Sequence, residues 1–204
     1  KLMGFTIVRA NAFTDKQFKG NPAAVCIMTS PREDTWMQSV AAEMNLSETA
    51  FLLEQEDGHS LRWFTPTTEV DLCGHATLAS AHALWETGSL PRDRQARFHT
   101  RSGLITAESK GDWIEMDFPA DPAKQMTTNS NSLLTALKTE GRLIGFTGTN
   151  FLVEVDSPGI VRTLSPDFKL LSLLGARVIV TSPSDEPAFD FVCRYFAPSI
   201  GIDE

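Results

Sequence analysis

The residues best suited to chemistry lie in the run 71–88, which begins DLCGHAT and continues in small side chains. This pattern predicts a helix over 74–87 that other backbone approaches from nearly all sides. The first amides of a helix have no partner inside it, and the helix dipole adds positive potential there. Cys73, Gly74 and His75 therefore stand where a helix could bind an anion.

His75 falls in the first turn of this helix. The dipole disfavours a protonated ring there, which predicts a neutral imidazole that donates a hydrogen bond or relays a proton. The alternative is a histidine satisfied by nearby backbone. His82 lies two turns further along, too far to share a metal ion with His75, so no metal site is predicted. We expect His82 and Glu86, an i,i+4 pair, to serve packing.

Cys73 offers a second possible base. A thiol at a helix N-terminus can have a lowered pKa, so Cys73 could itself transfer protons. The alternative is a buried cysteine that acts as a small hydrophobic residue. Asp71 is expected to cap the helix or its entry loop.

Glu48 stands in NLSETAFL, between the end of one predicted helix and an apolar strand. Partial desolvation there would raise the pKa of its carboxyl group and make it a proton acceptor and donor. The alternative is that it alternates outward on the strand and is solvated.

Several sequence motifs are missing. There is no Walker-type phosphate loop, no Gly-x-Gly-x-x-Gly between a strand and a helix, and no Gly-x-Ser-x-Gly. No lysine stands in the segments described above, which disfavours a Schiff-base cofactor. If the chain is an enzyme, proton transfer without a cofactor is the chemistry that remains.

The composition is that of a globular protein, with 204 residues, 42% of them hydrophobic and 22% charged. A net charge of −8 argues against a nucleic-acid surface. No apolar stretch approaches the ~18–20 residues of a membrane span. The three cysteines, Cys26, Cys73 and Cys193, are odd in number and far apart, which fits reduced thiols in the cytoplasm.

The order of predicted elements indicates an α+β chain of two lobes, each a mainly antiparallel sheet curled around a helix. A proline-rich segment at 119–122 predicts the boundary, with an N-terminal lobe over 1–120 and a C-terminal lobe over 121–204. The second lobe contains no counterpart of the small-residue helix at 74–87. We therefore expect it to be incomplete.

Four segments together resemble the PhzF-like isomerase family of phenazine biosynthesis, related in fold to diaminopimelate epimerase. They are DKQFKGNPAAV (15–25), EMNLSETAFL (43–52), RWFTPTTEVDLCGHATLASA (62–81) and RYFAPSIGIDE (194–204).

The resemblance implies two lobes, a homodimer, no cofactor and a small carboxylated metabolite as substrate. It makes Glu48 the general acid/base and His75 its assistant. Ser47 and Gly74 match residues that hold the substrate or relay protons, and Asn21 and Cys73 are expected beside them. Family members continue beyond the segment matching 202–204 with a turn that opens a further helix.

Two alternatives stay open within this fold. Cys73 occupies the place of a catalytic thiol in the related epimerases, so a thiol-assisted epimerase or racemase is possible. That chemistry needs a second base, and Cys193 is not placed to provide it. The other alternative is a dimeric binding protein without catalysis.

Overall fold

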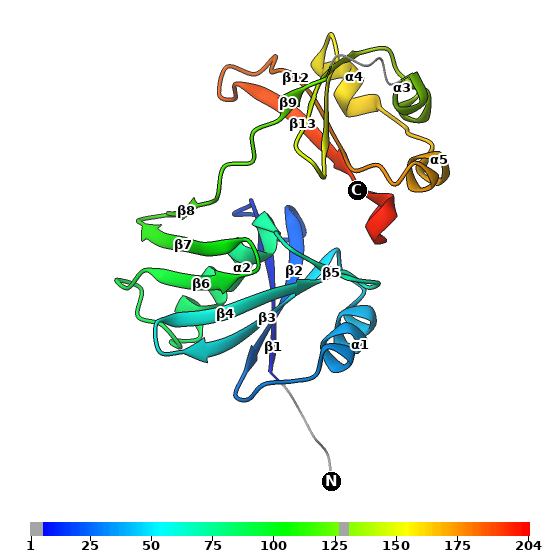
Figure 1. The fold of residues 1–204 in the computed structure, drawn as a ribbon. Helices are drawn as coiled ribbons and strands as arrows, with labels where there is room; N and C mark the ends of the chain where they lie inside the picture. Colours follow the sequence, from blue (N-terminus) through cyan, green and yellow to red (C-terminus); the bar gives the residue numbers. More distant parts are fainter. Residues whose placement is uncertain (1–5, 127–130) are drawn as a thin grey trace. The chain divides into compact units, whose positions relative to one another are not determined.

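The computed structural model describes residues 6–126 and 131–204, which form two compact units, Lys1–Pro119 and Ala120–Glu204 (Figure 1). Within the described residues, no helix is long and apolar enough to cross a membrane.

The first unit is built on one curled sheet of eight strands. They are β1 (Ile7–Ala12), β2 (Asn21–Met28), β3 (Glu48–Gln55), β4 (Gly58–Phe64), β5 (Glu69–Val70), β6 (Ala96–Thr100), β7 (Gly103–Lys110) and β8 (Trp113–Asp117). Seven run in the order β1-β2-β3-β4-β6-β7-β8, and β5 pairs with β4. Only β2–β3 and β4–β6 are parallel pairs among these, so the sheet is mainly antiparallel as predicted.

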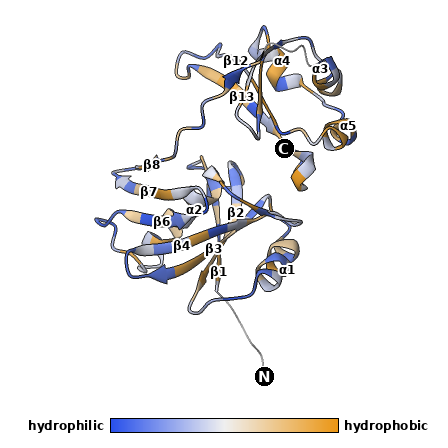
Figure 2. Cartoon of the chain, in the orientation of Figure 1, coloured by the Kyte–Doolittle hydropathy of each residue, from blue (hydrophilic) through white to orange (hydrophobic). Residues whose placement is uncertain are grey.

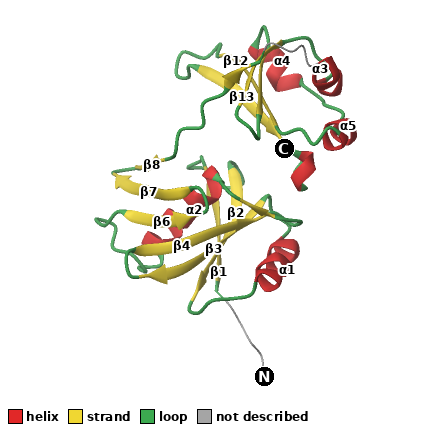
Figure 3. Cartoon of the chain, viewed as in Figure 1, coloured by secondary structure: helices red, strands yellow, loops and turns green. Residues whose placement is uncertain are grey.

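Two helices flank this sheet, α1 (Asp34–Met44) and α2 (Gly74–Glu86), as Figure 3 shows. Helix α2 packs against β1, β2 and β3, and most of its 13 residues are buried. Seven of these 13 residues are glycine, alanine, serine or threonine, because larger side chains would hold the strands away. Gly88 follows the helix with a φ of 73°, a left-handed conformation that favours glycine.

Strand alternation decides which side chains of β3 meet α2. Phe51 faces α1, where it packs in one cluster with Met37 and Phe64. Because successive residues of a strand point to opposite faces, Ala50 and Glu48 face the other side. That side is the α2 side, since Glu48 contacts the first turn of α2. The alternative of an outward, solvated Glu48 is therefore wrong.

The second unit holds a five-stranded sheet in the order β13-β12-β11-β10-β9, in which only β11–β12 is parallel. Its elements are β9 (Lys124–Gln125), β10 (Arg142–Phe146), β11 (Phe151–Glu154), β12 (Val178–Pro183), β13 (Phe191–Phe196), α3 (Asn131–Leu137), α4 (Pro158–Thr163), α5 (Phe168–Leu173) and η1 (Pro198–Ile200). Hydrophobic residues cover most of α5 (Figure 2) and join one core with residues of α3, α4 and β12. In the described residues of this unit, no helix matches the length of α2.

Several local expectations are wrong. Asp71 does not cap α2: the N-cap residue is Cys73, and Asp71 is exposed, 3.7 Å from Arg101. His82 and Glu86 are both exposed and do not serve packing, because they lie on the solvent side of α2. Gly20, Asn21 and Pro22 are residues typical of a turn, but β2 already begins at Asn21.

Candidate active site

The candidate site lies where the start of β3 meets the start of α2. Glu48 is the first residue of β3, and His75 lies in the first turn of α2. Glu48 Oε2 and His75 Nε2 are 3.4 Å apart, and the two side chains are 12% and 9% exposed. The structure therefore brings together the two residues that the resemblance assigns to proton transfer.

Burial moves both groups toward their neutral forms. It raises the pKa of Glu48 above its ordinary value of 4.5, against opposing hydrogen bonds from Ser47 and Cys73. It lowers the pKa of His75 to about 4, although a hydrogen bond to the Pro22 carbonyl acts the other way. The expected neutral imidazole is found at neutral pH, but burial rather than the helix dipole is the main cause. The Glu48–His75 contact is thus no ion pair at neutral pH.

Ser47 and Asn21 extend this contact. Ser47 Oγ donates a hydrogen bond to Asn21 Oδ1 at 3.3 Å and also lies 3.3 Å from His75 Nε2. Asn21 begins β2, the parallel neighbour of β3. The Ser47 hydroxyl therefore lies between Asn21, the first residue of β2, and the imidazole ring.

Cys73 completes the cluster from the N-cap position of α2. Its Sγ lies 3.4 Å from His75 Nδ1, and its thiol donates a hydrogen bond to the Glu48 carboxylate. The backbone amides of His75 and Ala76 favour the thiolate, but burial and the charge of Glu48 outweigh them. The pKa of Cys73 is raised well above its ordinary value. The helix N-terminus therefore does not lower the pKa of this thiol, and the burial of Cys73 fits the alternative of a small buried cysteine.

Gly74 leaves space open beside these side chains. It is exposed at the first position of α2, and a Cβ built on it would meet no atom within 4 Å. The amides of the first turn of α2 have no partner further back in the helix. This end of the helix can therefore receive a negatively charged group of a ligand.

No cation contributes to the pKa of the Glu48 carboxyl group. Burial raises this pKa, and hydrogen bonds from a hydroxyl and a thiol lower it.

Glu48, Cys73 and His75 form a set of possible metal ligands. One ligand atom of each residue lies within 4.8 Å of the ligand atoms of the other two. No metal site was predicted from the sequence, in which Glu48 is distant from Cys73 and His75.

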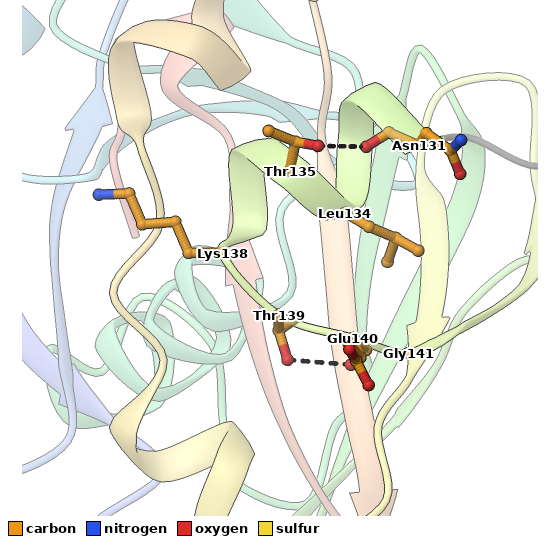
Figure 4. A pocket seen from close by; sticks show the side chains of 7 residues that line it. All are labelled: Asn131, Leu134, Thr135, Lys138, Thr139, Glu140 and Gly141. Carbon is orange, nitrogen blue, oxygen red and sulfur yellow. Dashed lines mark hydrogen bonds between the residues drawn. The ribbon is translucent and has the colours of Figure 1, made fainter.

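Two hollows lie elsewhere on the surface. One of about 620 Å³ adjoins α3, where Lys138 extends away from the Thr139–Glu140 turn (Figure 4). The other, of about 690 Å³, lies at the far end of β3 and is lined by Glu54 and His59. Neither is lined by a residue of the Glu48–His75 cluster.

Sequence reasoning missed a second buried carboxylate. Glu69 accepts two hydrogen bonds of 2.7 Å from Arg62 and lies 2.6 Å from Arg101. Arg62 also donates to Asp34 of α1 at 2.7 Å. In the sequence, Arg62 alternates with Leu61 and Trp63 on one strand. This alternation is the one signal that could have placed the Arg62 side chain on the α1 side of the sheet.

Comparison with known proteins gives concordant results. A curated relative, an uncharacterized isomerase of Halalkalibacterium halodurans, is 48% identical over 100% of this chain and 77% of its own. A crystal structure from the PhzF family of Enterococcus faecalis is 34% identical, with a TM-score of 0.84 over 99% of this chain and 76% of its own.

A more distant structure shares the fold alone. It is a hydroxyproline epimerase of Agrobacterium vitis with bound trans-4-hydroxy-L-proline, 14% identical, with a TM-score of 0.56 over 90% of this chain and 69% of its own. These likenesses confirm the predicted epimerase-like fold class. The family model for phenazine biosynthesis-like proteins matches residues 10–204. The chain therefore belongs to the PhzC-PhzF family.

Proposed function

We propose that this protein is a cofactor-independent isomerase that moves a proton between two carbons of a small carboxylated metabolite. The observation that carries the proposal is the buried Glu48 carboxyl group, whose pKa is raised and whose partners are a hydroxyl, a thiol and a neutral imidazole. Membership of a family with relatives named isomerases supports the reaction class.

In the proposed reaction, a Glu48 oxygen removes a proton from a substrate carbon. The electron pair of the broken C–H bond moves into the neighbouring π system of the substrate. The same carboxyl group then returns the proton at another carbon, so atoms and charge balance without a redox partner. His75 Nε2, 3.4 Å from Glu48 Oε2, can orient this carboxyl group and exchange a proton with it.

The substrate carboxylate is proposed to bind at the start of α2. The amides of the first turn and the open space at Gly74 support this position. It would bring the substrate beside Glu48, because His75 belongs to the same turn of the helix and contacts Glu48. Proximity of this kind is a large part of what an enzyme contributes to proton transfer.

The test is solvent hydrogen exchange. Purified protein is incubated in D₂O with a panel of unsaturated and α-amino carboxylic acids, and ¹H NMR follows deuterium entry at carbon. Exchange should occur in at least one compound and vanish in Glu48→Gln. Glu54→Gln is the matched control, since Glu54 lies on the same strand at its exposed end. Equal exchange in Glu48→Gln and wild type would refute the role of Glu48.

A thiol-assisted epimerase is the second candidate, favoured by the contact of Cys73 Sγ with His75 Nδ1 at 3.4 Å. In that case Cys73→Ser abolishes exchange at a stereocentre, whereas the Glu48 proposal expects exchange to persist. If the panel compounds bind to the wild type but show no exchange, the protein is a binding protein of the same fold.

The family resemblance also supports a homodimer. Sedimentation equilibrium at several protein concentrations checks this, and a mass that stays at the 22.4 kDa of one chain would contradict it.

A further inference from the structure

We propose that Glu48, Cys73 and His75 also form a binding site for a thiophilic divalent cation such as Zn²⁺, and that the bound ion blocks proton transfer. The binding part of this proposal stands on the geometry of the three side chains. The blocking part rests on the proposed function, because it requires Glu48 to be the base.

The donor set fits such an ion. A thiolate, an imidazole nitrogen and a carboxylate oxygen are the ligand types of protein zinc sites, whereas Mg²⁺ and Ca²⁺ prefer oxygen ligands alone. Zinc bonds of about 2.0–2.3 Å in a tetrahedron place the ligand atoms roughly 3.3–3.8 Å apart. Cys73 Sγ and His75 Nδ1 are 3.4 Å apart, and one donor atom of each of the three residues lies within 4.8 Å of the others.

The surroundings support the same assignment. If Nδ1 binds the ion, the other ring nitrogen keeps its hydrogen and can donate it to Ser47 Oγ, 3.3 Å away. Metal-bound histidines usually have such an outer hydrogen-bond partner. The backbone amides of His75 and Ala76, which favour the thiolate of Cys73, would stabilise it in the bound state as well.

Binding would form a metal–sulfur bond as the Cys73 S–H bond breaks, with the proton released to water. The carboxylate oxygen of Glu48 would then be held by the ion and could not accept a proton from substrate. The fourth coordination position would remain for water, since three protein ligands leave one site of a tetrahedron open. The site would thus alternate between a metal-free active form and a metal-bound inactive form.

Cobalt spectroscopy tests the binding part without any substrate. Protein freed of metal by EDTA and dialysis is titrated with Co²⁺. We expect one equivalent to give the visible bands of tetrahedral cobalt and a near-ultraviolet thiolate-to-cobalt band. The thiolate band should disappear in Cys73→Ser and persist in Cys193→Ser, which removes an exposed thiol instead.

Glu48→Gln provides a second arm if Cys73→Ser fails to fold. It should keep the thiolate band but weaken cobalt binding at least about 10-fold, and Glu54→Gln should not weaken it. A thiolate band lost in Cys193→Ser, or absent from the wild type, overturns the proposal.

Inhibition is measured separately in the exchange assay. Zn²⁺ should stop exchange, and EDTA should restore it. Cobalt binding through Cys73 with exchange unaffected by saturating metal would support the metal site and reject the role of Glu48. Exchange that depends on Glu48 in a protein without the cobalt bands would reject the metal site alone.

Discussion

Glu48 and Glu69 leave the same share of their side chains exposed, 12% each, and both belong to the sheet of the first unit. Their partners differ. Glu69 is held by the guanidinium groups of Arg62 and Arg101 at 2.6–2.7 Å. Glu48 contacts a hydroxyl, a thiol and a neutral imidazole.

Burial alone therefore does not decide what a carboxylate does. The two guanidinium groups occupy the oxygens of Glu69, which suits it to joining β5, β4 and the loop that holds Arg101. The Glu48 charge is desolvated, and no cation is among the groups that act on its carboxyl group, so the pKa of this group is raised and its protonated form is favoured. A carboxyl group of the second kind is suited to accepting and returning protons.

The largest expected effect concerns catalysis. Glu48→Gln should lower the rate of solvent exchange by about 10²–10⁴-fold, the usual contribution of a general acid–base group. Glu69→Gln should keep exchange near the wild-type rate, because the contacts that the structure describes for Glu69 are with Arg62 and Arg101 and not with the Glu48–His75 cluster. The measurement is deuterium incorporation by NMR under identical conditions, and equal losses in both variants would remove the distinction between the two glutamates.

The next effect is the pH dependence of stability through His75. Its pKa falls from 6.5 to about 4 on folding, so its contribution is present above pH 6.5 and is lost as the pH falls toward 4. This shift corresponds to about 3 kcal/mol. The difference in unfolding free energy between wild type and His75→Gln should shrink by up to that amount between pH 7 and pH 4. Urea titrations with EDTA present measure it, and a constant difference would show that His75 is not held neutral.

Removal of the Glu69 carboxylate, which is paired with arginines, should change the free energy of unfolding somewhat less than the pH effect of His75. Glu69→Gln leaves Arg62, which is 25% exposed, with Asp34 as its remaining carboxylate partner among the contacts described above. We expect a loss of about 1–3 kcal/mol in the free energy of unfolding. Glu48→Gln, in contrast, should not destabilise the protein at pH 7, because it removes a buried charge that has hydrogen bonds but no cation among its partners. Destabilisation by Glu48→Gln equal to that by Glu69→Gln would contradict the comparison.

The smallest expected effect on stability comes from Gly74→Ala. A Cβ at this position meets nothing within 4 Å, and alanine favours helix more than glycine, so stability should stay equal or rise by less than about 1 kcal/mol. The new methyl group would occupy the proposed place of the substrate carboxylate, so KM should rise. Thermal denaturation and exchange kinetics measure the two properties, and an unchanged KM would move the substrate carboxylate away from Gly74.

The sequence predicts local elements well where strong signals bound them. Helix α1 spans Asp34–Met44, where apolar residues recur in the sequence at helical spacing. Helix α4 was missed, although Ser157 and Pro158 carry the common signal of an N-cap followed by proline.

The partners of the site residues are less accessible to sequence reasoning. The contact between Glu48 and His75 joins two elements distant in sequence, and no spacing rule predicts it; only the family resemblance suggested it. The pKa direction of Cys73 depends on burial and on Glu48 as a neighbour. A helix N-terminus alone therefore gave the wrong direction.

The central claim is that burial beside a hydroxyl, a thiol and an imidazole raises the pKa of the Glu48 carboxyl group. The direct test is a pH titration of metal-free protein carrying ¹³C-labelled glutamate carboxyl groups, with Glu48→Gln and Glu69→Gln used to assign the two signals. The account predicts a titration midpoint for Glu48 above its ordinary value of 4.5. A midpoint at or below 4.5 would contradict it, and Glu48 would then be a structural carboxylate like Glu69.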